Sequence, residues 1–188
     1  MLQDIRTRVQ SFIGARTQPN LFDCQATSIH IVTGGKKSIG AIRASLLEYG
    51  DPGEPGNIGD EICSLINPKL YEYKDNASIA DMRRYLNEGC VLIVHGYLSN
   101  SGHVFVLDGR KDGLFDVVDV FEEFDAATWS YPKYWSNFRK AYNGYYSELL
   151  IYATCVAGGS FADAEEIYRR GRIDDRLGNA WLHIIKPG

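Results

Sequence analysis

The chain has 188 residues, of which 45% are hydrophobic and 23% are charged, and this is enough for one well-buried core but too little for two. We therefore expect a single domain over residues 1–188. The 20 basic and 24 acidic side chains give a net charge of −4, and no segment is rich in Lys or Arg, which argues against nucleic acid as a partner.

The N-terminus predicts an amphipathic helix, because Leu2, Ile5, Val9 and Phe12 recur at helical spacing before a loop over residues 14–20. This segment lacks the apolar stretch and the small-residue cleavage site of a signal peptide. No later apolar run reaches the length of a membrane span. We therefore expect a soluble, cytoplasmic protein without a membrane span, and delivery outside the cell by another route stays open.

Cys24 lies where a nucleophilic thiol would be activated. Asp23 can cap a helix whose first turn contains Cys24 and which stops at Gly34 and Gly35. The positive end of the helix dipole at this N-terminus favours the thiolate form of a cysteine. The competing interpretation is a cysteine that is merely buried, and we accept that interpretation for the other three cysteines, Cys63, Cys90 and Cys155.

Three further helices are predicted in the first half of the chain. One covers residues 38–49, and the next covers residues 59–66 after a Pro- and Gly-rich loop over residues 51–56. A third begins at Ser78 and stops at Gly89. Ser before the first turn and Gly after the last turn are typical helix boundaries.

The pattern then changes from helical to strand-like. Short apolar runs bounded by turn residues predict strands. One more helix is predicted, with Ser160 as its cap. The expected strands are residues 91–98, 103–107, 114–121, 145–153 and 180–185, and the expected helix is residues 161–170. A mainly helical half, residues 1–89, would thus carry the cysteine, and a mainly antiparallel β half, residues 90–188, would carry His103. The expected fold class is α+β.

Other polar residues complete the set that a cysteine nucleophile requires. A thiol that attacks a carbonyl needs an imidazole to take its proton, a group that orients the imidazole, and donors for the oxyanion. His103 opens an apolar strand and is the candidate base, and Asp119 follows one hairpin later. Gln18 precedes Cys24 by six residues and is the candidate oxyanion donor. Asp116 competes with Asp119, because it lies on the same predicted strand with opposite parity and only one of them can face a cleft.

This order of residues resembles the papain-like cysteine peptidases, and in particular the branch related to bacteriocin-processing (double-glycine) peptidases. The likeness covers about residues 16–121 and is carried by Gln18, residues 23–28 (DCQATS), residues 82–94, residues 102–109 (GHVFVLDG) and residues 117–119. The resemblance implies a single papain-like domain.

The resemblance also implies a role for each site residue. Cys24 would be the nucleophile, His103 the base and later acid, and Asp119 the orienter of the imidazole. The Gln18 side chain would share the oxyanion with the Cys24 backbone amide. The chain departs from the family pattern at Gln25 and Val120, where the family usually has Gly and Pro, and Gln25 puts a bulky side chain beside the thiol.

The remaining metal-ligating residue types do not form a recognisable site. The four cysteines are isolated from one another, without the paired spacing of a zinc or redox site. His30 lies in the helix after Cys24, His95 in an apolar strand and His183 in the closing strand, and we interpret all three as structural. We predict no cofactor and no metal.

An aromatic segment over residues 129–135 continues at residues 142–146. Clustered Trp and Tyr could form a platform for a sugar ring or an extended peptide. The competing interpretation, which we favour, is a loop folded over the sheet whose aromatic side chains fill the edge of the core.

We therefore expect a stand-alone cysteine peptidase or amidohydrolase that cleaves a peptide or protein substrate through an acyl-enzyme on Cys24. Transporter-coupled leader removal is not supported, because the chain has no membrane span and no Gly-rich nucleotide-binding loop. One alternative is a peptidoglycan-cleaving amidase or endopeptidase of the cell-wall-lysin type. Another is a catalytically inactive papain-like module that binds peptides, which Gln25 and Val120 encourage.

Overall fold

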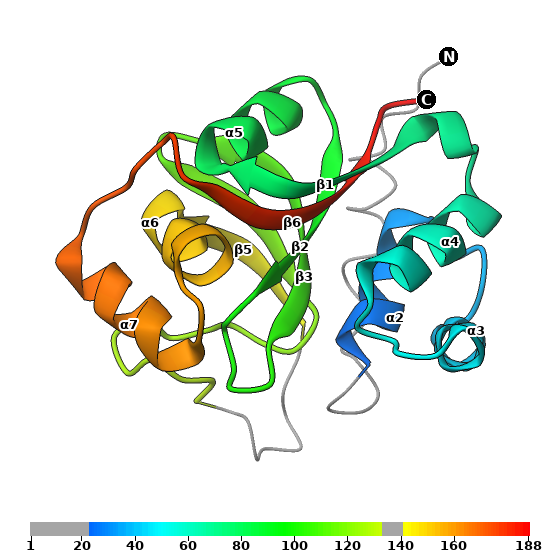
Figure 1. The fold of residues 1–188 in the computed structure, drawn as a ribbon, viewed down its shortest axis with the longest axis horizontal. Coiled ribbons are helices and arrows are strands. Elements are labelled where there is room, and N and C mark those ends of the chain that lie inside the picture. Colours follow the sequence, from blue (N-terminus) through cyan, green and yellow to red (C-terminus); the bar gives the residue numbers. More distant parts are fainter. Residues whose placement is uncertain (1–22, 133–140) are drawn as a thin grey trace.

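One antiparallel sheet of six strands organises the chain, and helices cover both of its faces (Figure 1). This computed structural model describes residues 23–132 and 141–188, so the predicted N-terminal helix lies outside the described residues. The strand order across the sheet is β1-β6-β2-β3-β4-β5, and all neighbours are antiparallel. The predicted α+β class is confirmed.

The helices and strands have the following bounds along the chain. The strands are β1 (Tyr71–Ser78), β2 (Val91–Gly96), β3 (His103–Lys111), β4 (Leu114–Asp119), β5 (Tyr142–Ser147) and β6 (Gly178–Ile185). The α-helices are α2 (Cys24–Val32), α3 (Ile39–Tyr49), α4 (Pro55–Leu65), α5 (Ile79–Asn87), α6 (Glu148–Ile151) and α7 (Phe161–Arg170). A 3-10 turn, η2 (Pro68–Leu70), precedes β1, and a π-helical segment, η3 (Tyr152–Ala157), continues α6.

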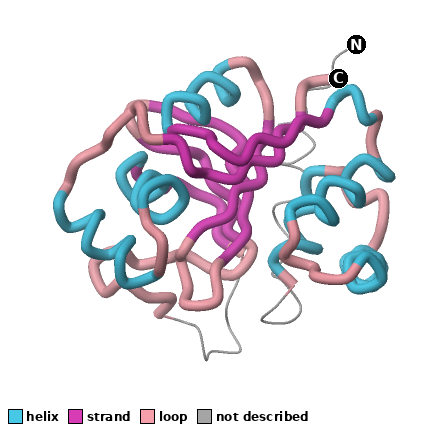
Figure 2. Tube along the Cα trace, in the orientation of Figure 1, coloured by secondary structure: helices cyan, strands magenta, loops and turns pink. Residues whose placement is uncertain are grey.

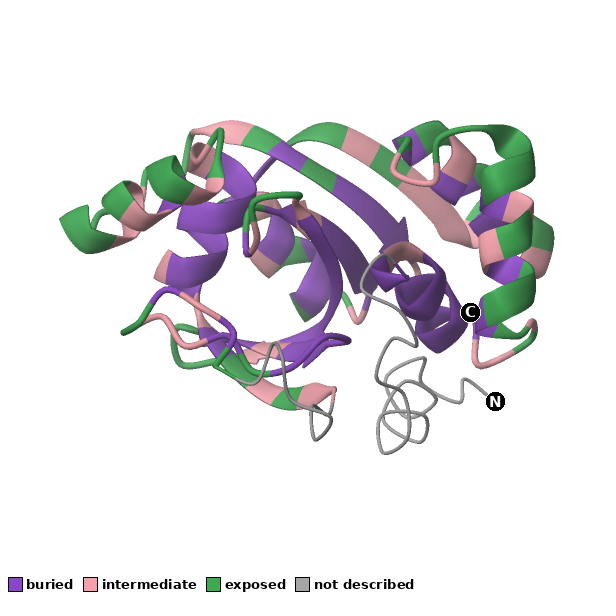
Figure 3. Ribbon diagram, turned by 90° about the horizontal axis from the view of Figure 1, so that it is seen from below, coloured by how far each residue is buried: buried purple, intermediate pink, exposed green. Residues whose placement is uncertain are grey.

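The central strands are apolar on both faces because helices cover both faces. Successive side chains of a strand point to opposite sides. On β2, Val91 and Ile93 join the core beneath α2, α3 and α4, whereas Leu92 and Val94 join the core that α5, α6 and η3 share. Figure 2 shows the two groups of helices on either side of the strands, and Figure 3 shows that the central strands are mostly buried while the outer helices are widely exposed.

Helices with strong local boundary residues lie where the sequence predicts them. Ser38 caps α3, with its Oγ accepting a hydrogen bond from the Ala41 N–H at 3.2 Å. Ser78 and Asp81 form a reciprocal capping box at the start of α5. Helix α4 begins earlier than predicted, at Pro55, because Pro fits the first turn of a helix. Among the helices of the described residues, none combines the length and the apolar composition that spanning a membrane would take.

Two strand predictions are wrong. Strand β1 was not expected, because the alternation that begins at Tyr71 stops after Lys74 in polar residues, yet it pairs with β6 from Tyr71 opposite Ile185 onward. The predicted strand over residues 145–153 ends at Ser147, whose Oγ accepts a hydrogen bond from the Leu150 N–H at 3.1 Å and starts α6. The first half of the chain thus supplies one strand of the sheet, and the second half supplies α6, η3 and α7.

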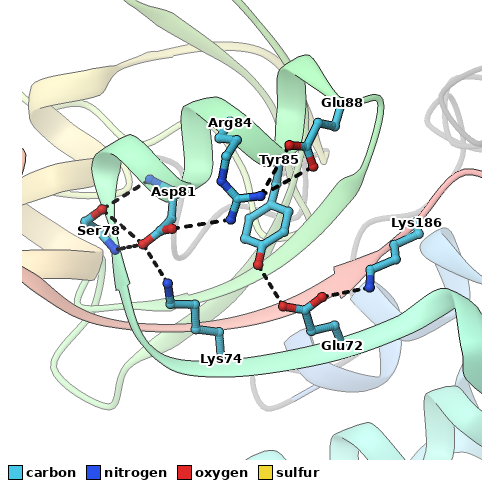
Figure 4. A network of polar contacts seen from close by, with 8 residues as sticks. All are labelled: Glu72, Lys74, Ser78, Asp81, Arg84, Tyr85, Glu88 and Lys186. Atoms are coloured by element: carbon cyan, nitrogen blue, oxygen red, sulfur yellow. Dashed lines mark hydrogen bonds and ion pairs between the residues drawn. The ribbon is translucent and has the colours of Figure 1, made fainter.

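A polar network fastens α5 to the β1 edge of the sheet (Figure 4). The Tyr85 hydroxyl donates to Glu72 at 2.7 Å, and Lys186 of the chain after β6 lies 2.7 Å from the other Glu72 oxygen. Lys74 of β1 reaches Asp81 at 2.9 Å. The pKa of Asp81 falls to about 2, because hydrogen bonds from Ser78 and Lys74 outweigh the opposite effect of burial.

Candidate active site

Cys24 is the first residue of α2 and its side chain is buried. Asp23 occupies the N-cap position, as predicted, but its side chain makes no capping hydrogen bond. Its backbone angles, φ −102° and ψ 15°, differ from the extended geometry of a capping residue, and its Oδ1 lies 3.1 Å from Arg43 Nη1 on α3. The ion pair between Asp23 and Arg43 therefore fastens the start of α2 to α3.

The cysteine helix is held against the histidine strand. The Ser28 hydroxyl, one turn after Cys24, donates to the Val104 carbonyl at 3.3 Å. Val104 follows His103 directly at the start of β3. This buried contact places the N-terminal end of α2 beside the end of the strand that carries the imidazole.

His103 and Asp119 meet at one end of the sheet. His103 opens β3 and Asp119 closes β4, and because these neighbouring strands are antiparallel, both residues lie at the same end. His103 Nε2 lies 2.7 Å from Asp119 Oδ1. His103 is 7% exposed and Asp119 is 0% exposed, so the pair is shielded from water.

The pKa of His103 shows how this pair and Cys24 act together. Burial alone would lower the pKa, but the charge of Asp119, the hydrogen bond to Asp119 and a hydrogen bond with Cys24 raise it to about 10. Since Nε2 is engaged by Asp119, Nδ1 is the ring nitrogen that remains for Cys24. The structure therefore brings three of the four predicted site residues together in the order thiol, imidazole, carboxylate.

Asp116 points away from this group. It lies on β4 opposite Gly109 and Tyr145. A Cβ atom added at Gly109 would come 2.2 Å from Asp116 Oδ2, so the carboxylate fills the space that this glycine leaves. The sequence left Asp116 and Asp119 as competitors, and the structure places Asp119 against His103.

Two tyrosines of the aromatic segment, for which the sequence predicted no role at the catalytic residues, bind Asp119. The Tyr131 hydroxyl donates to Asp119 Oδ2 at 2.7 Å, and the Tyr146 hydroxyl donates to the same oxygen at 3.0 Å. Tyr131 and Trp129 are both buried, which supports the interpretation of the aromatic segment as a loop folded over the sheet and not as an open platform. Residues 133–140 of that segment lie outside the described residues.

The fourth predicted site residue, Gln18, also lies outside the described residues. Gln25, where the resembled family usually has Gly, contacts the thiol directly. The Cys24 Sγ donates to Gln25 Oε1 at 3.3 Å. The Gln25 side chain therefore lies beside the thiol, as predicted, and makes a polar contact with it.

The other histidines contact groups outside this site. His30 Nδ1 lies 2.7 Å from the Lys37 carbonyl. His95 Nε2 lies 3.1 Å from His183 Nε2, and His183 Nδ1 lies 2.9 Å from the Tyr71 hydroxyl. Within residues 23–132 and 141–188, no group of three or more His, Cys, Asp or Glu side chains is arranged to hold a metal ion.

Comparison of the chain with protein-family models, with curated proteins and with solved structures gave no significant match. The functional assignment therefore depends on the geometry of the site and on the residues that compose it.

Proposed function

We propose that this chain is a cysteine peptidase or amidohydrolase with a papain-like arrangement of its site. One observation carries the proposal: a buried imidazole is hydrogen-bonded to a buried carboxylate and lies beside a thiol at a helix N-terminus. A helix that carries the cysteine packs against an antiparallel sheet that carries the histidine and the aspartate. This relation between the elements is what a papain-like fold requires.

In the first half of the reaction, His103 holds the proton that Cys24 gives up, and the Cys24 thiolate attacks the substrate carbonyl carbon. A C–S bond forms, and the carbonyl electron pair moves to oxygen. The Cys24 backbone N–H, free of an intrahelical acceptor in the first turn, stabilises this oxyanion, and the proposed second donor is the Gln18 side chain. The oxyanion then collapses, the C–N bond breaks, and His103 gives its proton to the leaving amine.

In the second half, water hydrolyses the Cys24 thioester. His103 takes a proton from the attacking water, the new C–O bond forms, and the C–S bond breaks. The proton stays on His103 and the sulfur leaves as the thiolate, which restores the starting pair. Asp119 stays hydrogen-bonded to Nε2 throughout, which keeps Nδ1 directed at the reacting atoms.

The proposal is tested by trapping the acyl-enzyme. The protein is incubated with a p-nitrophenyl ester and with a pool of fluorogenic peptides, and it is then quenched with acid for mass spectrometry. We expect an acyl adduct on Cys24, together with peptide cleavage that Cys24→Ala abolishes and Cys63→Ala preserves. Acylation spread over all cysteines, with no cleavage that depends on Cys24, would contradict the proposal.

The inactive peptide-binding module has one supporting observation, the contact of Gln25 with the thiol. In that case, peptide binding persists in Cys24→Ala and no acyl adduct forms in the wild-type protein. The turbidity of purified cell walls tests the cell-wall alternative. If peptidoglycan is the substrate, the wild-type protein lowers the turbidity and Cys24→Ala does not.

A further inference from the structure

Asp119 has a hydrogen-bond donor for every lone pair of its carboxylate. Its Oδ1 accepts from His103 Nε2 at 2.7 Å and from the Phe121 N–H at 3.0 Å. Its Oδ2 accepts from Tyr131 and Tyr146 at 2.7 and 3.0 Å. A carboxylate offers about four lone-pair sites, so all of them are engaged, and the carboxylate cannot rotate without breaking several bonds at once.

The Tyr146 hydroxyl can donate in only one good direction. It accepts a hydrogen bond from the Phe124 N–H at 2.7 Å, so its single proton is left for a separate acceptor. That acceptor is Asp119 Oδ2 at 3.0 Å, since the alternative, the Glu122 carbonyl, is farther away at 3.4 Å. Tyr146 therefore links the chain after β4 to the carboxylate at the end of β4.

Tyr131 acts with its ring as well as with its hydroxyl. Its ring meets the His103 ring edge-on, with centroids 5.9 Å apart, and meets the Phe121 ring at 4.9 Å. Burial, followed by the nearby Asp119 charge, raises the pKa of both Tyr131 and Tyr146, so each hydroxyl keeps the proton that it donates. A Tyr→Phe substitution removes this hydroxyl while the ring stays in place.

We propose that Tyr131 and Tyr146 are positioning residues of the proposed peptidase site, which hold Asp119 Oδ2 so that Oδ1 stays directed at His103. Neither residue takes part in bond making. Each acts through Asp119, by fixing the orientation of the imidazole toward Cys24. The inference rests on the proposed function, because it assigns these hydroxyls a task only if His103 assists the thiol.

Tyr85, near the β1 edge of the sheet, provides a matched control. Tyr85 also donates its hydroxyl to a carboxylate, Glu72, at 2.7 Å, and it is also buried (Figure 4). Glu72 lies on β1, whereas Asp119 lies on β4, with three strands between them. Tyr85→Phe therefore removes the same kind of bond without touching the site.

The experiment measures the rate of Cys24 alkylation by limiting iodoacetamide from pH 5 to 9 in the wild-type protein, Tyr131→Phe, Tyr146→Phe, the double variant and Tyr85→Phe. We expect each single variant to lose about tenfold at pH 6, with a changed pH profile, and the double variant to lose more, because a buried carboxylate oxygen is left unsatisfied. Tyr85→Phe should keep the wild-type rate and profile. Proton NMR adds a second readout, the downfield resonance of the His103 Nε2 proton, which should weaken or shift in both site variants and not in Tyr85→Phe.

The outcomes separate the two proposals. If wild-type Cys24 reacts no faster than the other cysteines, the proposed function fails. If wild-type Cys24 is selectively reactive and both single variants keep its rate, its pH profile and the NMR resonance, the positioning role is overturned. Urea unfolding identifies any variant that does not fold, and the two single variants decide the matter if the double variant is lost.

Discussion

His103 and the pair His95 and His183 lie on neighbouring strands of one sheet, and their pKa values shift in opposite directions. His103 on β3 pairs in register with Gly96, the residue next to His95 on β2, and His183 on β6 lies opposite Ile93. Burial lowers the pKa of His95 to about 4, and burial together with His95 lowers the pKa of His183 well below its usual value. His103 is buried as well, yet its pKa rises to about 10.

The opposite pKa shifts come from the hydrogen-bond partner of each histidine and not from its burial. His103 faces the Asp119 carboxylate, which stabilises an imidazolium. His95 and His183 face each other through their Nε2 atoms, so one ring donates and the other, which must be neutral, accepts. The lowered pKa values of both rings favour a neutral pair. The first arrangement keeps a proton on His103 at neutral pH, which suits an imidazolium beside a thiolate, and the second suits a structural contact.

The largest expected effect comes from giving His103 a neutral partner. Asp119→Asn should reduce the alkylation rate of Cys24 at pH 6 and any peptidase kcat/KM by about 10²- to 10⁴-fold, because the imidazole loses both its charge partner and its orientation. An NMR titration should show the pKa of His103 falling well below 10, since only Cys24 then opposes the effect of burial. Asp116→Asn is the matched control and should leave both quantities unchanged.

The comparison would break if Asp119→Asn left the pKa of His103 near 10. Such a result would mean that another group holds the imidazolium, and the thiol–imidazole–carboxylate order would lose its physical basis.

A second effect concerns stability in acid. Since the pKa values of His95 and His183 are lower in the folded state than in the unfolded chain, the unfolded chain binds more protons as the pH falls below about 6.5. Their contribution to the free energy of unfolding is complete above pH 6.5 and is lost as the pH falls toward about 4, by up to about 1.4 kcal/mol per pH unit for each histidine.

Urea unfolding at pH 7, 5.5 and 4.5 measures this loss, and His95→Gln should show a shallower pH dependence than the wild-type protein. Equal slopes would contradict the assignment of a neutral pair. His103 has the opposite sign: its contribution is complete below about pH 6.5 and is lost as the pH rises toward 10.

The smallest expected effect comes from Gln25. Gln25→Ala removes the acceptor that holds the Cys24 Sγ at 3.3 Å and opens space beside the thiol, so we expect alkylation of Cys24 to become about two- to fivefold faster. Ala maintains the helix at this position. A rate that falls, with an unchanged pH profile, would show that Gln25 assists the site instead of covering it.

The helix predictions that depended on capping residues agree with the structure. Helices α3, α5 and α7 have Ser38, Ser78 and Ser160 as N-cap residues, and in each case the serine side chain accepts a hydrogen bond from the first turn. Caps of this kind act within a few residues and can be read from the sequence. Strand β1 was missed because its alternation stops after Lys74 in polar residues, and it forms only when β6, from the far end of the chain, pairs with it.

Some residues of the candidate site could likewise be predicted from the sequence, and others could not. Cys24, His103 and Asp119 could be named from residue type and order, but strand parity alone could not choose between Asp119 and Asp116. The roles of Tyr131 and Tyr146 depend on contacts across 12 and 27 residues of chain, which no local pattern announces. Gln18 stays a prediction, because it lies outside the described residues.

The most direct measurement of the central claim is alkylation of the native protein by limiting iodoacetamide between pH 5 and 9, with each labelled cysteine identified by mass spectrometry. Burial raises the pKa of Cys63, Cys90 and Cys155, so these thiols serve as slow internal references. We predict rapid and selective labelling of Cys24 below pH 7 that disappears in His103→Ala and persists in His95→Ala. Slow labelling of Cys24 with the pH profile of a free thiol, unchanged in His103→Ala, would contradict the account.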